Sequence, residues 1–248
     1  MQDFSAYQTF AKEKLGFTFT DPQVFVTALT HRSYVNEHKK STKEHNERLE
    51  FLGDAVLELV VTTYLYSNYS EPEGILTNWR AALVRTESIG AAGAKLGLDQ
   101  LMRMSRGEKH ADSPRARQQI LANAFEAVIG AIYLDQGYDA ASKFIHDYIL
   151  STFNDILASG SWRDPKSRLQ EVAQSTEGNT PVYKVLEETG PDHDKMFILG
   201  VFVSGKLKGK GSGPSKQVAQ QEAAKAALEG YDKTGPDSVG MGSNQPTH

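Results

Sequence analysis

Three acidic residues, followed later by an asparagine and a fourth acidic residue, recur at helical spacing in two segments that are otherwise mostly apolar. Glu47, Glu50 and Asp54 lie three and four residues apart, so a helix places them on one narrow face. Asn123 and Glu126 are three residues apart and share a face in the same way. Carboxylate and amide oxygens form a ligand set that suits magnesium or manganese. The spacing therefore indicates an oxygen-only metal site between two helices.

The first of these segments, residues 47–69, is predicted to be a buried helix. Nearly every other position in its first three turns is apolar, and a helix that is apolar almost all round is buried. Buried carboxylates repel one another unless a cation neutralises them. The alternative is an ordinary solvated helix face, because the spacing alone is common. Glu58 either extends the acidic face or marks where the helix leaves the core, and we favour the second interpretation.

The elements that position these residues are predicted to be helical up to residue 157. Apolar residues repeat at helical spacing in 4–15, and Asp21-Pro22 predicts the start of a helix that continues to residue 29. Loops are expected at 36–46 and 105–115, and no strand is expected in this part. Further helices are predicted at 47–69, 75–85, 87–97, 116–136 and 138–157. This pattern predicts an all-α domain over residues 1–158.

After a short linker at 159–163, the pattern changes to that of a small α+β domain. A helix at 165–175 is followed by strands at 182–188, 196–203 and 207–211 and by an alanine-rich helix at 215–229. The order α-β-β-β-α predicts a second domain at 164–231. Residues 232–248 are rich in Gly, Pro, Ser and Asn and are predicted to be a disordered tail.

Composition narrows the class of protein. The chain has no cysteine, which excludes disulfides, zinc–thiolate sites and thiol nucleophiles. No apolar run is long enough to span a bilayer and the first residues do not resemble a signal peptide, so we expect a cytoplasmic protein without a membrane partner. The net charge is −4, yet basic residues slightly outnumber acidic ones from 159 to 233. This asymmetry fits either an ordinary surface or a polyanion-binding domain joined to an acidic enzyme.

Longer motifs resemble a known family. Residues 46–57, NERLEFLGDAVL, closely resemble the signature of the ribonuclease III family, and the likeness extends to 28–34 (ALTHRSY) and 120–135 (ILANAFEAVIGAIYLD). Residues 165–228 resemble a double-stranded-RNA-binding domain. Together these segments span nearly the whole chain apart from the tail.

The resemblance implies a role for each acidic residue. Asp54 and Glu126 match the central metal ligands and Glu50 a further ligand, while Glu47 and Glu73 match residues that position the substrate and a second ion. Asn123 stands where the family more often has aspartate; its amide oxygen can still coordinate the ion but brings no charge. The expected cofactor is Mg²⁺, for which Mn²⁺ can substitute, with no small-molecule cofactor.

The resemblance also implies an RNA-binding surface made by Gln170, Gln174, His193 and Lys216. Glutamine replaces lysine at two usual lysine positions in the last helix, Gln217 and Gln220, so weaker and less salt-dependent binding is expected. The lysines of the third strand either compensate or form a solvated strand face; they are Lys206, Lys208 and Lys210. A structural or dimer-related role is expected for His31, Arg32 and Tyr34.

As a whole, the resemblance implies a homodimer, joined through the catalytic domain, that cuts double-stranded RNA. Metal-activated water would attack phosphorus, leaving 5′-phosphate and 3′-hydroxyl ends with short 3′ overhangs, in the processing of ribosomal and messenger RNA precursors. Two alternatives stay open. One is a catalytically impaired double-stranded-RNA-binding protein, which Asn123 alone supports, and the other is an enzyme of a different phosphoryl transfer.

Overall fold

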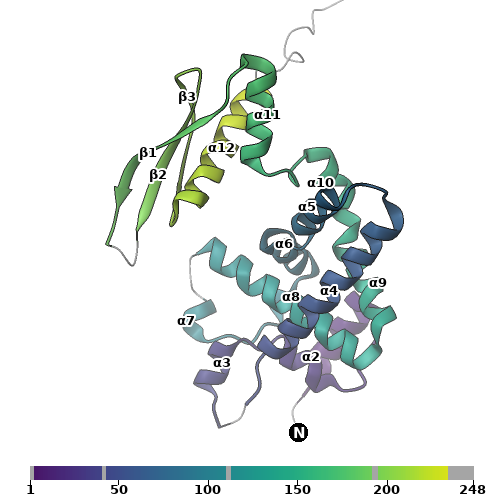
Figure 1. Ribbon diagram of the computed structural model, residues 1–248. Helices are drawn as coiled ribbons and strands as arrows, with labels where there is room; N and C mark the ends of the chain where they lie inside the picture. Colours follow the sequence, from purple (N-terminus) through teal and green to yellow (C-terminus); the bar gives the residue numbers. More distant parts are fainter. Residues whose placement is uncertain (1–2, 41–42, 110–112, 192–194, 234–248) are drawn as a thin grey trace, which may run out of the picture. The chain divides into compact units, whose positions relative to one another are not determined.

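The computed structural model describes residues 3–40, 43–109, 113–191 and 195–233 (Figure 1). The chain divides into two compact units, Met1–Trp162 and Arg163–His248, and each has its own hydrophobic core. The expected fold class, a helical part followed by a small α+β part, is confirmed. Within the described residues, no helix has both the length and the apolar content that crossing a membrane requires.

The first unit is a bundle of helices around two long ones, α4 and α8 (Figure 1). Its elements, in chain order, are α1 (Ser5–Phe10), the π-helical turn η1 (Ala11–Leu15), α2 (Pro22–Ala28), α3 (Arg32–Glu37), α4 (Glu47–Asn68), α5 (Glu73–Leu83), α6 (Thr86–Leu96), the 3₁₀ turn η2 (Leu98–Gln100), α7 (Arg106–Lys109), α8 (Pro114–Gln136), α9 (Tyr138–Tyr148), the 3₁₀ turn η3 (Leu150–Thr152) and α10 (Phe153–Ser159).

Both ends of α8 are fixed by short-range chemistry. The Ser113 hydroxyl accepts a hydrogen bond from the Ala116 amide at 3.3 Å and Pro114 occupies the first turn, so the helix begins before the predicted residue 116. Near the other end, the Asp135 carboxylate accepts hydrogen bonds from the Thr20 and Asp21 amides at 2.9 and 2.8 Å. This carboxylate ties the end of α8 to the start of α2.

Two other expectations for this unit need correction. The short helix α7 lies inside the predicted loop 105–115, and η3 divides the single helix predicted at 138–157. Both are short-range features that helical periodicity cannot resolve. An isolated parallel bridge joins Thr30 to Arg103, but among the described residues of this unit no strand forms, as expected.

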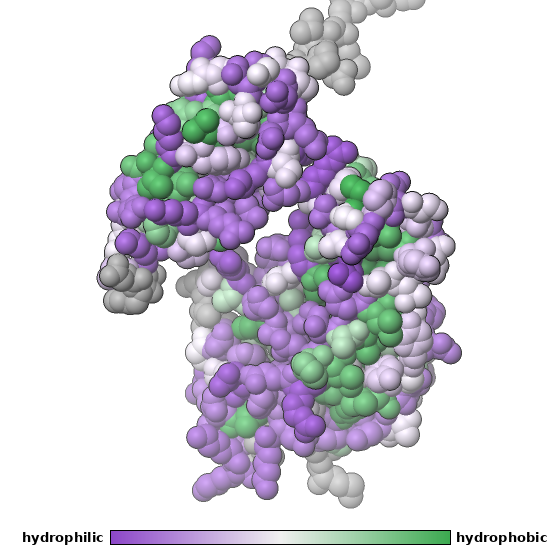
Figure 2. Space-filling view, in the orientation of Figure 1, coloured by the Kyte–Doolittle hydropathy of each residue, from purple (hydrophilic) through white to green (hydrophobic). Residues whose placement is uncertain are grey.

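The prediction that residues 47–69 form a fully buried helix is also wrong. Leu57 and Val61 are fully buried, but Phe51 and Tyr66 are 81% exposed and Leu59 is 56% exposed. One side of α4 therefore packs on the bundle, while another side carries large apolar groups on the surface of this chain. Figure 2 shows apolar side chains gathered on the face of the unit along which α4 runs.

The second unit is one antiparallel sheet covered on one face by two helices (Figure 1). Its elements are α11 (Pro165–Glu177), β1 (Val182–Thr189), β2 (Met196–Val203), β3 (Lys206–Gly213) and α12 (Lys216–Lys233), and β2 is the central strand. The pairing of β1 with β2 runs from Val182–Phe202 to Thr189–Met196, with an irregularity between Val185 and Glu187.

Small residues allow α12 to lie directly on β3. A Cβ atom on Gly209 would lie 2.4 Å from the Ala223 carbonyl oxygen, and one on Gly211 would lie 2.1 Å from the Ala223 nitrogen. The facing side of α12 is buried and consists of alanine at Ala219, Ala223 and Ala227. Alternate glycines on the strand therefore leave room for an alanine-faced helix.

Candidate active site and nucleic-acid interface

The candidate metal site depends on close backbone contact between α4 and α8. A Cβ atom on Gly53 would lie 1.8 Å from the Glu126 carbonyl oxygen, and one on Gly130 would lie 2.3 Å from a carbonyl oxygen of α4. Only glycine permits this approach at either position. Glu50 and Asp54 flank Gly53 on α4, so the contact brings their side chains towards Glu126 on α8.

The carboxylates of this cluster interact electrostatically. Burial first, and then the charges of Asp54 and Glu50, raise the pKa of Glu126 from its usual range to about 8. Burial, together with Glu47 and Asp54, also raises the pKa of Glu50. The charged groups that contribute to these two shifts are carboxylates, so Glu50, Asp54 and Glu126 lie close enough to disfavour one another's ionised forms.

This donor set fits a divalent cation. The four predicted ligands can each offer an oxygen atom to the ion, and oxygen is the ligand atom that Mg²⁺ and Mn²⁺ prefer; they are Glu50, Asp54, Asn123 and Glu126. Within the described residues, no three His, Asp or Glu side chains are already close enough together to hold an ion. The pKa of Glu126 is raised first by burial and then by repulsion from Asp54 and Glu50, and a divalent cation would offset that repulsion.

Asn123 lies one helical turn before Glu126 on α8, as its spacing predicts. Its Oδ1 atom accepts a hydrogen bond from Gln119 Nε2 at 2.7 Å. The amide oxygen is therefore already partly engaged within the helix, and one of its lone pairs remains for a metal ion.

Glu47 lies at the edge of the cluster. Its carboxylate is 3.3 Å from Arg32 Nη1 and 3.9 Å from His45 Nδ1. It still acts on the cluster, because its charge contributes to the raised pKa of Glu50. Arg32 belongs to α3, whose first turn is capped by His31 through the Ser33 amide at 3.3 Å.

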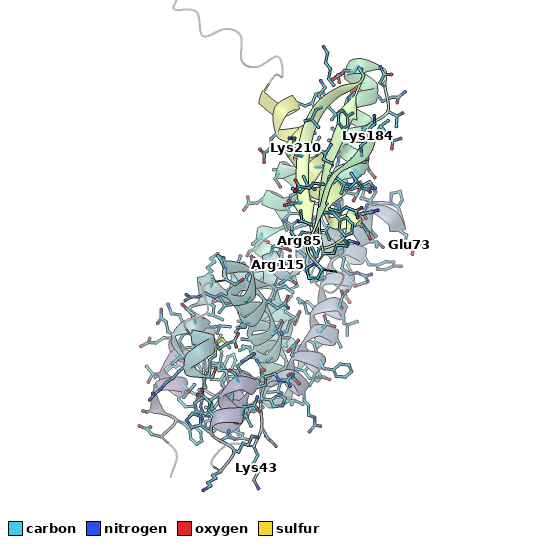
Figure 3. All side chains as sticks on the ribbon, turned by 90° about the vertical axis from the view of Figure 1, so that its left-hand side faces the viewer. Lys43, Glu73, Arg85, Arg115, Lys184 and Lys210 are labelled. Atoms are coloured by element: carbon cyan, nitrogen blue, oxygen red, sulfur yellow. The ribbon has the colours of Figure 1, made fainter. Side chains whose placement is uncertain are left out.

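Two other acidic residues stand apart from the cluster. Glu58 is 3.1 Å from Arg80 Nε, as expected for a residue that leaves the core rather than joins the site. Glu73 is exposed in the first turn of α5 (Figure 3) and, in the described part of the chain, contributes to neither raised pKa. The structure thus brings together Glu47, Glu50, Asp54 and Glu126, but not Glu73.

The predicted RNA-contacting residues of the second unit lie on its surface. Gln170 and Gln174 are both exposed on α11, while the residues directly before them, Leu169 and Ala173, are buried. Lys216 is exposed in the first turn of α12. His193 lies outside the described residues.

Family models match both units. A Ribonuclease-III-like model matches residues 21–153, and a Double-stranded RNA binding motif matches residues 165–231. A "Ribonuclease 3" of Desulforamulus reducens is 45% identical over 233 residues, covering 92% of this chain and 94% of that protein. The chain belongs to the ribonuclease III family.

Further relatives agree with this assignment. The "Ribonuclease 3" of Chloroflexus aggregans is 45% identical over 224 residues, covering 88% of this chain and 95% of the relative. A solved nuclease domain of the ribonuclease III from Campylobacter jejuni is 38% identical, with a TM-score of 0.50. That match covers 56% of this chain and 96% of the Campylobacter chain, and the description of that structure mentions a region involved in dimer formation.

Sequence reasoning missed a network of hydrogen bonds and an ion pair that joins the elements of the second unit of this ribonuclease III family member. Glu177, at the end of α11, lies 2.6 Å from Lys208 Nζ and accepts hydrogen bonds from the hydroxyls of Tyr231 and Ser204 at 2.5 and 3.1 Å. Lys208 and then Tyr231 contribute most to lowering the pKa of Glu177 to about 2. Lys208 therefore serves within the unit, while Lys206 and Lys210 are exposed on β3; Lys210 is labelled in Figure 3.

A second missed contact concerns one of the two glutamines in usual lysine positions. Lys166, on the first turn of α11, donates a hydrogen bond to Gln220 Oε1 at 2.7 Å and lies over the Tyr183 ring at 5.2 Å. A cation therefore does lie beside this position of α12, although it comes from another helix. Sequence spacing could not reveal it, because the two residues are far apart in the chain.

Proposed function

We propose that the chain is an endoribonuclease that cuts double-stranded RNA. The observation that carries this proposal is the charge cluster of Glu50, Asp54 and Glu126, held between α4 and α8 in a chain that also carries a double-stranded-RNA-binding motif. A binding protein without catalysis has no use for carboxylates that destabilise one another. A duplex nuclease requires them for its metal ion.

In this proposal, Glu50, Asp54, Asn123 and Glu126 hold Mg²⁺, or Mn²⁺ in its place. The bound ion would supply an activated water and stabilise the negative charge that develops on the phosphate. A cation held there would favour the ionised form of Glu126, because its positive charge would offset the charges of Asp54 and Glu50. Glu47 and Glu73 position the substrate. The products carry 5′-phosphate and 3′-hydroxyl ends with short 3′ overhangs.

The exposed side of α4 supports a homodimer. Phe51 is 81% exposed and lines a cavity of about 810 Å³, together with apolar residues such as Leu49 and Leu134 and charged ones such as Glu44 and Arg48. A two-fold contact could cover an exposed ring in such a cavity, because each copy offers the same patch to the other. We therefore propose that two copies meet through this face, each contributing one metal site.

The physiological substrates that we propose are structured precursors of ribosomal and messenger RNA. The site of action would then be the cytoplasm. The second unit would bind the double-stranded regions of such precursors, because its motif recognises A-form geometry and 2′-hydroxyl groups.

The test is cleavage of end-labelled duplex RNA in Mg²⁺ by this protein, its Asn123→Asp variant and its Glu126→Gln variant. We expect the first two to cut duplex RNA, to leave a single strand of the same sequence intact and to stop when the metal is chelated. If only the Asn123→Asp variant cuts, the site is sound but impaired at one position. If none cuts and all bind duplex RNA, the protein is a binding protein.

A further inference from the structure

An acidic residue lies against the lysine that opens α12. Glu188 Oε1 is 3.2 Å from Lys216 Nζ, and Glu188 Oε2 is 4.0 Å from Lys195 Nζ. Glu188 is on β1, directly opposite Phe197 on β2, and the Lys216 ammonium lies 5.4 Å from the centre of that ring. One carboxylate is thus shared by two cations on the surface that is predicted to meet the phosphate backbone.

We propose that Glu188 sets the affinity of this unit for duplex RNA by competing with phosphate for Lys216. The inference rests on the proposed function, since it assumes that the surface binds RNA. Glu188 then keeps the affinity for the RNA backbone below the value that the lysines alone would give. The competing ligand is a backbone phosphate of the duplex.

The composition of α12 makes this competition matter. Lys216 is the only basic residue in the first two turns, residues 216–222, because Gln217 and Gln220 are uncharged. Lys166 lies beside Gln220, but Lys216 is the cation that the helix start itself supplies, so pairing it with Glu188 weakens the electrostatic attraction of this helix start for phosphate. The helix start still offers its amide groups to phosphate, but without a full positive charge.

The ion pair between Glu188 and Lys216 is weak enough for a phosphate to compete with it. The side chains of Lys216 and Glu188 are 57% and 38% exposed, so water screens their attraction and the pair is weak. Lys216 can therefore turn to a phosphate at little cost, but the Glu188 charge stays nearby and repels that phosphate. The Phe197 ring offers Lys216 a second contact that does not depend on the carboxylate.

The experiment measures binding of the full chain to a perfect duplex of about 20 base pairs, longer than the roughly 16 that one such motif spans. Divalent metal is chelated to prevent cleavage, and the dissociation constant is followed by fluorescence anisotropy over a range of salt concentrations. The variants are Glu188→Gln and Glu188→Thr, the second chosen because threonine favours strands. The matched control is Glu187→Gln, which makes the same change in charge one residue away; within the described residues, Glu187 has no ion pair.

We expect both Glu188 variants to bind about threefold to fivefold more tightly at moderate salt, with a slope of log K against log salt that is steeper by up to about one. The control should change either value by much less. In a Lys216→Gln background, Glu188→Gln should lose most of its effect. A fold defect would weaken binding and lower the melting temperature, and so could not imitate the expected result.

The outcomes separate this inference from the function beneath it. If the unmodified chain does not bind duplex RNA, the proposed function itself fails. If it binds but Glu188→Gln binds equally or less tightly, RNA binding stands and the inference is wrong; weaker binding with a normal melting temperature would show that Glu188 positions Lys216. If Glu187→Gln strengthens binding as much as Glu188→Gln, the effect is one of general charge and the inference also fails.

Discussion

Two glutamates, one in each unit, have pKa values that their surroundings shift in opposite directions. Glu126 lies among carboxylates in a partly buried place, and its pKa is raised to about 8. Glu177 lies beside Lys208 and the Tyr231 hydroxyl, and its pKa is lowered to about 2. In the first unit, burial and neighbouring carboxylates disfavour the ionised form of Glu126, whereas in the second unit Lys208 and Tyr231 favour the ionised form of Glu177.

The same contrast applies to the glycines that bring backbones together. Gly53 and Gly130 allow α4 and α8 to touch beside the acidic cluster, while Gly211 allows α12 to lie on β3 among alanines. Close backbone packing at glycine thus brings charged side chains together in the first unit, whereas in the second unit it only completes the hydrophobic core. Changes near the first contact should therefore alter chemistry, and changes near the second should alter stability.

The largest expected effect is that of Glu126→Gln. Losing this carboxylate should reduce cleavage of duplex RNA by at least about a thousandfold, roughly 4 kcal/mol of transition-state stabilisation. Duplex affinity in chelator should change by less than about twofold, because the second unit is untouched. Single-turnover cleavage and anisotropy measure the two quantities. A matching loss of affinity would contradict the division of labour between the units.

Next in size is an alanine substitution at each close contact. Gly130→Ala and Gly211→Ala should each lower the free energy of unfolding by about 1–3 kcal/mol, because a Cβ would lie 2.3 and 2.1 Å from backbone atoms. Only Gly130→Ala should also raise the Mg²⁺ concentration needed for half-maximal cleavage. Calorimetry and metal titration test this pair.

The control for that pair is Gly74→Ala on α5, where an added Cβ has nothing within 4 Å. It should leave cleavage unchanged and stabilise the helix by at most about 1 kcal/mol. Equal loss of metal response in Gly211→Ala would remove the distinction drawn between the two contacts.

The two units should respond to pH in opposite directions. Folding favours the protonated form of Glu126, so its contribution to stability is full below about pH 4.5 and is lost as the pH rises towards 8. Folding favours the ionised form of Glu177, so its contribution is present above about pH 4.5 and is lost as the pH falls towards 2. Melting of the metal-free protein, followed by a probe in each unit, measures both trends.

Two variants sharpen the pH comparison. Glu126→Gln should reduce the loss of stability of the first unit as the pH rises towards 8. In the unmodified chain, Mg²⁺ should counteract that loss. Glu177→Gln should reduce the loss of stability of the second unit as the pH falls towards 2. Parallel curves for the variant and the unmodified protein would show that the carboxylate in question does not control the trend.

The smallest expected effect comes from Gln119→Ala, which frees the Asn123 amide oxygen from its 2.7 Å hydrogen bond. The Mg²⁺ midpoint for cleavage should fall by less than about fivefold, since one neutral hydrogen bond is worth about 1 kcal/mol or less. The same substitution in an Asn123→Ala background should have no such effect. An equal shift in both backgrounds would mean that Asn123 takes no part in metal binding.

The sequence predicted elements well where one periodicity ran for many residues, as in α4 and α8. It also predicted that Glu50, Asp54 and Glu126 would share one place, because residue types and spacing carry that information. It failed on the burial of α4: a helical wheel shows which side is apolar, but not whether that side meets this chain or another surface. Phe51 illustrates this failure.

Contacts between distant residues were beyond sequence reasoning for a different reason. Glu188 with Lys216, Glu177 with Lys208 and Lys166 with Gln220 each join separate elements. Charged residues are common on any surface, and local patterns do not say which pairs meet. Strand register and helix placement decide that, and both depend on the assembled unit.

The contact between α4 and α8 joins two helices that leave the ribosome at different times. The chain emerges from its amino end, so α4 is exposed before the three helices and the loops that precede α8 have been made. Until α8 arrives, the side of α4 that carries Gly53 lacks the helix against which it packs in the folded chain. Because α8 precedes the whole second unit in the chain, both helices that bring Glu50, Asp54 and Glu126 together are made before the strands of that unit.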